Sequence, residues 1–297
     1  MSDLRTATAT LDGPSAPPAA RRLCLYQPNY FPRLHYLARV LDSDVFDMAD
    51  DVQFSRGTGA RVEKAQGRHG RSWSYQAHAP IKTAAGRVDL VVPVHDHRRP
   101  LFRTEIDYSH KWVPKHLRTI ESGYRKALGY PELAPEIAAL LRTGVPTLGE
   151  LTTNTVLWAL AKVVSGGAAD GTAATVEEVN RLLGRPHRYR LRQVVLGSEV
   201  RPAADGDLPE VTADARIIAS CRRFGAVEYH CGGVGHGAYM DLDRYRDAGI
   251  RVVVQQWDGP PYRQRYGGAF IPNLSVVDLL MNESPEQWSS VLGGTAR

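Results

Sequence analysis

Residues 22–54 read RLCLYQPNYFPRLHYLARVLDSDVFDMADDVQF, and this stretch decides the fold. Residues 22–26 alternate apolar and polar side chains as a short strand does, and they run into a turn at residues 27–32. Pro32 permits a helix to start, and apolar residues then recur at helical spacing at Leu34, Leu37, Ala38 and Leu41. Residues 45–54 predict a second strand. The stretch is therefore a strand, helix, strand unit.

The rest of the chain extends this alternation. Residues 73–81 and 87–94 flank a turn at Gly86 and predict a hairpin. Residues 110–184 are expected to be mainly helical, since two capping boxes start helices there, Thr147 with Glu150 and Thr175 with Glu178. The last third predicts a helix at 214–224, a strand at 227–230, a helix at 242–248, a strand at 250–257 and a helix capped by Ser275.

These elements predict an α/β protein, with a mixed sheet, flanking helices and a mainly helical inserted segment. We expect one domain over residues 21–284. Residues 1–20 are rich in Ala, Pro, Thr and Ser and predict a disordered tail, because they hold too few large apolar groups to offset the entropy of ordering. Residues 285–297 are expected to form a C-terminal tail.

Composition narrows the functional classes. With 297 residues, 43% of them hydrophobic, the chain can bury a sizeable core. No apolar run has the length of a membrane helix, and the first twenty residues lack the apolar core of a signal peptide, so we expect a cytoplasmic protein without a membrane partner. Three widely spaced cysteines, Cys24, Cys221 and Cys231, form neither a disulfide framework nor a CxxC metal site.

A net charge of +5 is a modest attraction for anions. The densest basic stretch, residues 56–71, alternates arginines and one lysine with glycines. Two interpretations stay open for it: a lid over an anionic substrate, or a solvated loop. Because it has no interleaved aromatic residues, it is a poor platform for nucleic acid.

The first candidate site joins the turn at 27–32 to Asp50 and Asp51, because ligands of open α/β sheets bind at the carboxyl ends of the strands. Gln27 and Asn29 offer amide groups, Tyr30 offers a hydroxyl, and a carboxylate could orient or deprotonate an amine. The alternative is an ordinary polar turn with an aspartate pair that caps the next loop.

The second candidate is the glycine-rich segment at residues 228–239. Its glycines, Gly233 and Gly235 among them, would let backbone donors approach a phosphate, a carboxylate or an oxyanion. A Cys231 nucleophile with His236 as base is one alternative, and a metal site of His230, Cys231 and His236 is another. A purely structural role is the third.

A third group, His95-Asp96-His97, has metal-ligand residue types but follows a predicted strand in an Arg-rich turn, and this position favours exposure to solvent over a metal site. Only His95 and His97 could share one ion, because adjacent side chains on an extended segment point to opposite faces.

Several uncommon strings occur together in one order. They are Gln27 to Pro32, Asp50-Asp51-Val52-Gln53-Phe54, Val91 to Val94, Lys111-Trp112 with Lys115-His116, Tyr124, the glycine-rich segment ending in Tyr239, and Asn273 to Leu280. Over residues 22–283 the chain resembles the WbqC-like family. It departs from the family pattern at His78-Ala79, where members tend to have an Arg-Asn pair before the Ile-Lys that here is Ile81-Lys82.

The resemblance implies a bacterial protein of O-antigen or secondary-metabolite biosynthesis, a family in which a glycine transferase role has been suggested. It also implies that the matching residues contact substrate: Gln27, Asn29, Tyr30, Gln53, Lys82, Lys111, His116, Tyr124, Gly233, Gly235, Tyr239, Asn273 and Ser275.

The resulting hypothesis is transfer of an acyl or aminoacyl group onto an amine of a small molecule. The activated donor would be a carrier-protein thioester or an aminoacyl-tRNA, and we expect no cofactor. Asp51 is the preferred base, with Asp50 and His236 as further catalytic candidates. A nucleotide-sugar modifying enzyme and a non-catalytic binding protein remain alternatives, and the oligomeric state is left open.

Overall fold

The computed structural model describes residues 21–54, 74–96, 99–201, 212–238 and 240–293, so the expected N-terminal tail and the basic stretch at 56–71 lie outside the described residues. Its main element is a parallel five-stranded sheet in the order β5-β2-β1-β6-β7. The strands are β1 (Arg22–Tyr26), β2 (Val45–Met48), β5 (Gln193–Leu196), β6 (Glu228–Cys231) and β7 (Arg251–Val254).

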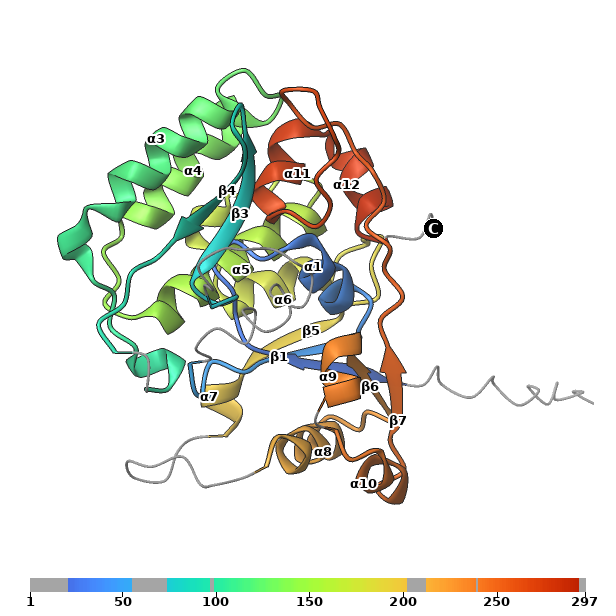
Figure 1. The fold of residues 1–297 in the computed structure, drawn as a ribbon. Coiled ribbons are helices and arrows are strands. Elements are labelled where there is room, and N and C mark those ends of the chain that lie inside the picture. The colour runs from blue at the N-terminus through green and yellow to red at the C-terminus, as the bar shows by residue number, and fades with distance from the viewer. Residues whose placement is uncertain (1–20, 55–73, 97–98, 202–211, 239, 294–297) are drawn as a thin grey trace, which may run out of the picture.

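Helices cover both faces of this sheet (Figure 1). On one face lie α1 (Leu34–Leu41), α5 (Leu148–Val164) and α6 (Val176–Leu183), and on the other lie α8 (Ala213–Arg223) and α10 (Leu242–Asp247). Strand side chains alternate between the two layers. Cys24 and Phe46 join the larger core with the first group of helices, whereas Leu23 and Val45 pack with the second group.

The α/β class is confirmed, but the mixed pairing is divided between two sheets. The expected hairpin forms a separate antiparallel sheet of β3 (His78–Thr83) and β4 (Gly86–Val91). β3 packs against α3 (Trp112–Tyr124) and α11 (Val276–Asn282). The hairpin therefore joins the helical layer and leaves the parallel sheet unextended.

The helical segment also forms as expected, with α4 (Tyr130–Arg142) between α3 and α5. Thr147 Oγ1 accepts a hydrogen bond from the backbone N–H of Glu150 at 3.3 Å. Thr175 Oγ1 accepts one from Glu178 at 3.2 Å. Both side chains cap α5 and α6 because each satisfies a donor that the first helical turn leaves unpaired.

The expected C-terminal tail is wrong for residues 285–291, which form α12 (Pro285–Val291). Trp288 is only 4% exposed in the core, and its Nε1 donates to the carbonyl of Glu283 at 2.8 Å. Proline at the first helical position is a start signal that the sequence analysis passed over. Burial of the indole then fixes a helix too short to be stable alone.

A buried polar network ties the hairpin to the helices. Asp278, fully buried on α11, accepts hydrogen bonds from the hydroxyls of Tyr124 at 2.5 Å and Tyr262 at 2.7 Å. The backbone N–H of Lys82 donates to Tyr124 Oη at 3.2 Å, and Lys82 Nζ donates to the Gly267 carbonyl at 2.8 Å. Such a network is costly unless satisfied, so these partners constrain how β3, α3 and α11 pack.

Three other buried side chains are imidazoles. His78 Nε2 lies 2.8 Å from Arg33 Nη2, His116 Nδ1 lies 3.0 Å from Tyr30 Oη, and His230 Nδ1 lies 3.2 Å from Ser43 Oγ. Burial lowers the pKa of each histidine to about 4, because an imidazolium is disfavoured away from water.

These histidines predict an acid-sensitive fold. Below about pH 6.5 the unfolded chain binds protons that the folded histidines refuse until about pH 4, so stability falls across this window. Each histidine contributes a slope of about 1.4 kcal/mol per pH unit. The raised pKa values of Asp50 and Asp278, caused by burial, act in the opposite direction, because the folded protein binds those protons first.

Denaturant unfolding measured across this range tests the prediction. In the His116→Gln variant, the free energy of unfolding should depend less steeply on pH, by about the slope that one histidine contributes. His110→Gln, whose parent side chain is 68% exposed, serves as the control and should leave it unchanged. A free energy of unfolding that stays constant between pH 6.5 and pH 4 would contradict the assignment.

Candidate active site

The strand order creates one point where connections diverge. The chain leaves β1 through α1 toward β2, whereas β6 leads through α10 to β7 on the opposite side. Ligands of open parallel sheets bind at such a switch point, beyond the carboxyl ends of the two strands. Here that place lies between the turn at 27–32, which follows β1, and Gly232, which follows β6.

His35, in the first turn of α1, has a defined tautomer. Asn273 Oδ1 accepts a hydrogen bond from the backbone N–H of His35 at 3.0 Å, which identifies this atom as the amide oxygen. The same oxygen lies 2.9 Å from His35 Nδ1, so Nδ1 must carry a proton and donate it. The lone pair of the neutral imidazole is then on Nε2, which has no hydrogen-bond partner among the described residues.

The electrostatic surroundings keep this imidazole neutral. Burial lowers the pKa of His35 to about 4, Arg39 and Arg33 lower it further, and the Asn273 hydrogen bond opposes them. Asn273 itself has a φ of 56°, in the left-handed region that asparagine tolerates better than most residues. Asn273 therefore orients the His35 ring, and the imidazole is unprotonated at Nε2 at neutral pH.

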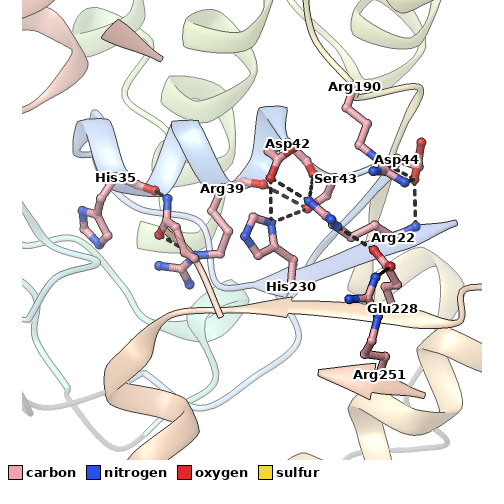
Figure 2. Close-up of polar contacts among 11 residues, drawn as sticks. Arg22, His35, Arg39, Asp42, Ser43, Asp44, Arg190, Glu228, His230 and Arg251 are labelled. Atoms are coloured by element: carbon pink, nitrogen blue, oxygen red, sulfur yellow. Dashed lines mark hydrogen bonds and ion pairs between the residues drawn. The ribbon is translucent and has the colours of Figure 1, made fainter. Parts of the chain in front are cut away.

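Arg39 follows one turn later on the same side of α1 (Figure 2). Its Nε donates to Gln255 Oε1 at 3.1 Å, and its guanidinium carbon lies 4.8 Å from the centre of the Tyr26 ring. Gln255 Nε2 in turn donates to the backbone carbonyl of His35 at 2.8 Å. Gln255 thus fixes Arg39 relative to His35.

His230 continues this row between α1 and the sheet, and beyond it the charged groups are paired (Figure 2). Arg22 contacts Asp42 at 2.7 Å and Glu228 at 2.9 Å, and Arg251 also pairs with Glu228. These ion pairs hold the amino ends of β1, β6 and β7 together, so we assign them a structural role.

Asp50 and Asp51 lie at the carboxyl end of β2, as expected, but outside the strand itself. β2 ends at Met48, so Asp50 and Asp51 occupy the turn after the strand and do not alternate across its faces. Asp50 accepts hydrogen bonds from the backbone N–H of Ser198 at 2.8 Å and from its hydroxyl at 2.6 Å. It therefore anchors the end of β5.

Asp51 is the centre of an ion-pair network. It contacts Arg201 Nε at 3.0 Å and Arg216 Nη1 at 2.6 Å, and Arg201 also holds the fully buried Asp47 at 2.5 Å. Both carboxylate groups are occupied by guanidinium donors. This geometry favours a structural role for Asp51 over the expected role of base.

The turn at 27–32 is held by its neighbours. Gln27 Oε1 accepts from Gln76 Nε2, and Gln27 Nε2 donates weakly to the Gln53 carbonyl at 3.4 Å. The Asn29 carbonyl accepts from Thr155 at 3.3 Å. Gln27 and Asn29 remain near the switch point, so their proposed contact with substrate stays a prediction.

Other motif residues pack around this turn and support it. Tyr30 contacts His116, Ser275 Oγ donates to the Phe31 carbonyl at 2.8 Å, and Lys82 and Tyr124 belong to the Asp278 network. Lys111 is exposed, with a φ of 47°, at the start of α3. The motif thus gathers around the turn largely through packing and internal hydrogen bonds.

The glycine-rich segment is helical where it is described. Gly233 and Gly235 lie in α9 (Gly233–Ala238), which directly follows Gly232. His236 is partly exposed on this helix, and Tyr239 lies outside the described residues. The segment follows β6 at the switch point, and its described part is a helical turn.

The thiols are poorly suited to nucleophilic attack. Burial raises the pKa of Cys221 to about 12 and also raises that of Cys231, which disfavours the reactive thiolate. Within the described residues, no three His, Cys, Asp or Glu side chains are placed to hold a metal ion. His97 of the third sequence candidate lies outside that part of the chain.

Comparison with known proteins now adds the family. The model of the WbqC-like protein family matches residues 27–163 and 191–290. The chain belongs to the WbqC-like protein family. A protein of Mycobacterium tuberculosis (strain ATCC 25618 / H37Rv), named Uncharacterized protein Rv1507c, is 26% identical over 271 residues, which cover 90% of this chain and 95% of that protein. No solved structure matches.

Within this WbqC-like chain, sequence reasoning missed His35 and Arg39. The two residues are four positions apart on α1, beside its apolar stripe. The helix directly follows the turn at 27–32, which the sequence analysis had already named as a candidate site. That spacing places two polar groups on one helix side at a strand's carboxyl end, and this was the available signal. Their partners Asn273 and Gln255 are more than two hundred residues away in sequence.

The network around Asp51 predicts a stability defect. Asp51→Asn leaves two guanidinium groups with only a neutral partner, so we expect the melting temperature to fall by about 5 °C or more. Asp50→Asn should cost less, because an amide can still pair with Ser198. Calorimetry of both variants tests this, and an Asp51→Asn protein as stable as the wild type would show that the ion pairs contribute little.

Proposed function

We propose that this protein transfers an acyl or aminoacyl group onto an amine, with His35 as the general base. The observation that carries the proposal is the His35–Asn273 pair, which presents an unprotonated Nε2 at the switch point of the sheet. We assign the base to His35 and not to Asp51, because two arginines already form ion pairs with the Asp51 carboxylate.

The reaction needs one proton acceptor that later becomes a donor. As the amine nitrogen attacks the donor's carbonyl carbon, a C–N bond forms and the amine proton passes to His35 Nε2. The tetrahedral intermediate then expels the thiolate of a carrier thioester or the ribose oxygen of an aminoacyl-tRNA, which takes the proton from the imidazolium. Asn273 holds the ring in place through both steps, since Nδ1 keeps its hydrogen bond.

The class of reaction follows the glycine transferase role suggested for members of the family, and that suggestion names no substrates. A donor carried by a protein or a tRNA, an amino sugar or natural-product amine as acceptor, and a cytoplasmic site of action all belong to this proposal. Among the helices that the structure describes, none has the length and apolar character to cross a membrane.

Mass spectrometry can test the reaction directly. The purified protein is incubated with a glycyl thioester or glycyl-tRNA and a panel of amino sugars, free and nucleotide-activated, and products are searched for one added glycyl residue. His35→Gln should lower the transfer rate by about a hundredfold or more, the usual scale for loss of a general base. His110→Gln, altered at an exposed histidine, is the matched control. Full activity of His35→Gln would refute the assigned base.

Asn273→Asp offers a second test through the pH profile. The base works unprotonated, so the rate falls as pH drops through the pKa of His35. A carboxylate beside Nδ1 favours the imidazolium and raises that pKa, hence the acid limb of the profile should move to higher pH. An unchanged acid limb in a folded and active variant would indicate that another group controls it.

A further inference from the structure

Arg39 is a buried cation whose terminal nitrogens have no hydrogen-bond partner in the part of the chain that the structure describes. Its side chain is 5% exposed, and among the described residues its only hydrogen bond from the guanidinium runs from Nε to Gln255. Nη1 and Nη2 have no acceptor in this part of the chain. Arginine is rarely buried to this extent without a partner, because removing a guanidinium from water costs several kcal/mol.

The groups around Arg39 supply no compensating charge. The Tyr26 ring lies beneath the guanidinium, and the other groups that would raise the pKa of Arg39 if they were ionised are Cys24, Cys231 and Tyr229. Burial raises the pKa of these two thiols and of the Tyr229 hydroxyl, so all three are neutral at physiological pH. A ring face attracts a cation but does not replace the hydrogen-bond acceptors that Nη1 and Nη2 lack.

Other arginines at the sheet have their charge compensated by a carboxylate. Arg201 and Arg216 both bind Asp51, and Arg22 binds Glu228. Each of these guanidiniums has a carboxylate within hydrogen-bond distance. Arg39 departs from this arrangement at the switch point, the place where parallel sheets bind ligands.

Gly232 lies directly against the end of the guanidinium. A Cβ on this residue would lie 2.9 Å from Arg39 Nη2 and 3.3 Å from Nη1. Glycine at the carboxyl end of β6 therefore lets the two terminal nitrogens approach the backbone more closely than a residue with a Cβ would allow.

We propose that Arg39, positioned by Gln255 and Gly232, is the receptor for one oxyanion group of a substrate, a carboxylate or a phosphate, bound beside His35. A planar guanidinium suits both groups because it can donate two parallel hydrogen bonds. The anion's role in catalysis rests on the proposed function, whereas the binding site itself rests on Arg39 alone.

Binding of simple anions tests the receptor without any transfer reaction. The full chain is titrated with inorganic phosphate and, separately, with acetate, followed by thermal unfolding and calorimetry, with sodium chloride at equal ionic strength as reference. Stabilisation of the folded state should grow with anion concentration. Arg39→Gln should weaken binding by about tenfold to a hundredfold, as expected for losing charge-assisted hydrogen bonds.

Two further variants separate geometry from net charge. Gly232→Ala keeps every charge but pushes the guanidinium away, so binding should weaken by about tenfold, and this variant decides the question if Arg39→Gln does not fold. Arg246→Gln removes an equal charge from a side chain that is 72% exposed, and it should bind like the wild type.

The outcomes are distinct. Stabilisation by phosphate alone or acetate alone upholds the receptor and identifies the substrate group. A wild type that responds no more than in chloride, or an Arg39→Gln variant that responds like the wild type, overturns it. His35→Gln should bind the anions normally, so failure of the base in the transfer assay and failure of the receptor are read from different measurements.

Discussion

Compensation of buried charge divides the carboxyl edge of the sheet into two halves. Beyond β2 and β5, the carboxylates of Asp47 and Asp51 and the guanidiniums of Arg201 and Arg216 satisfy one another. Removing one member of such a network exposes the rest to an uncompensated cost, so that half has little freedom to change. Beyond β1 and β6, Arg39 lacks any such carboxylate among the described residues. A folded protein that keeps this cost at a ligand-binding position has a functional reason to keep it.

The elements that depend on neighbouring residues could be predicted from the sequence. Caps at Thr147 and Thr175 act within one helical turn, and the alternation of strand and helix after Arg22 is equally local. The partners of the aspartates could not be predicted because they are distant in sequence: Ser198 is 148 residues from Asp50, and Arg201 is 150 residues from Asp51. A local sequence pattern cannot show that a carboxylate will form an ion pair with an arginine from a distant part of the chain.

The proposed base, His35, was missed for the same reason, because its partner is also distant in sequence. As part of an amphipathic helix, His35 looks like a polar residue beside an apolar stripe, and only Asn273, 238 residues later, fixes its tautomer. The family motif at Asn273 was recognised, but its partner was not. The glycines at residues 233–238 suggested backbone donors for an anion, whereas in the folded chain these residues form a helix despite the low helix propensity of glycine.

The proposed base, His35, and the proposed anion receptor, Arg39, lie one turn apart on α1, and Gln255 contacts both residues. Gln255 donates to the backbone carbonyl of His35 and accepts from Arg39, so it ties the Arg39 side chain to the first turn of α1, which carries His35. After burial, Arg39 is the largest cause that lowers the pKa of His35. An oxyanion on Arg39 would offset this positive field and raise the proton affinity of Nε2. The base would then be weakest in the empty protein and strongest once the substrate is bound, which limits wasteful hydrolysis of an activated donor before the amine arrives.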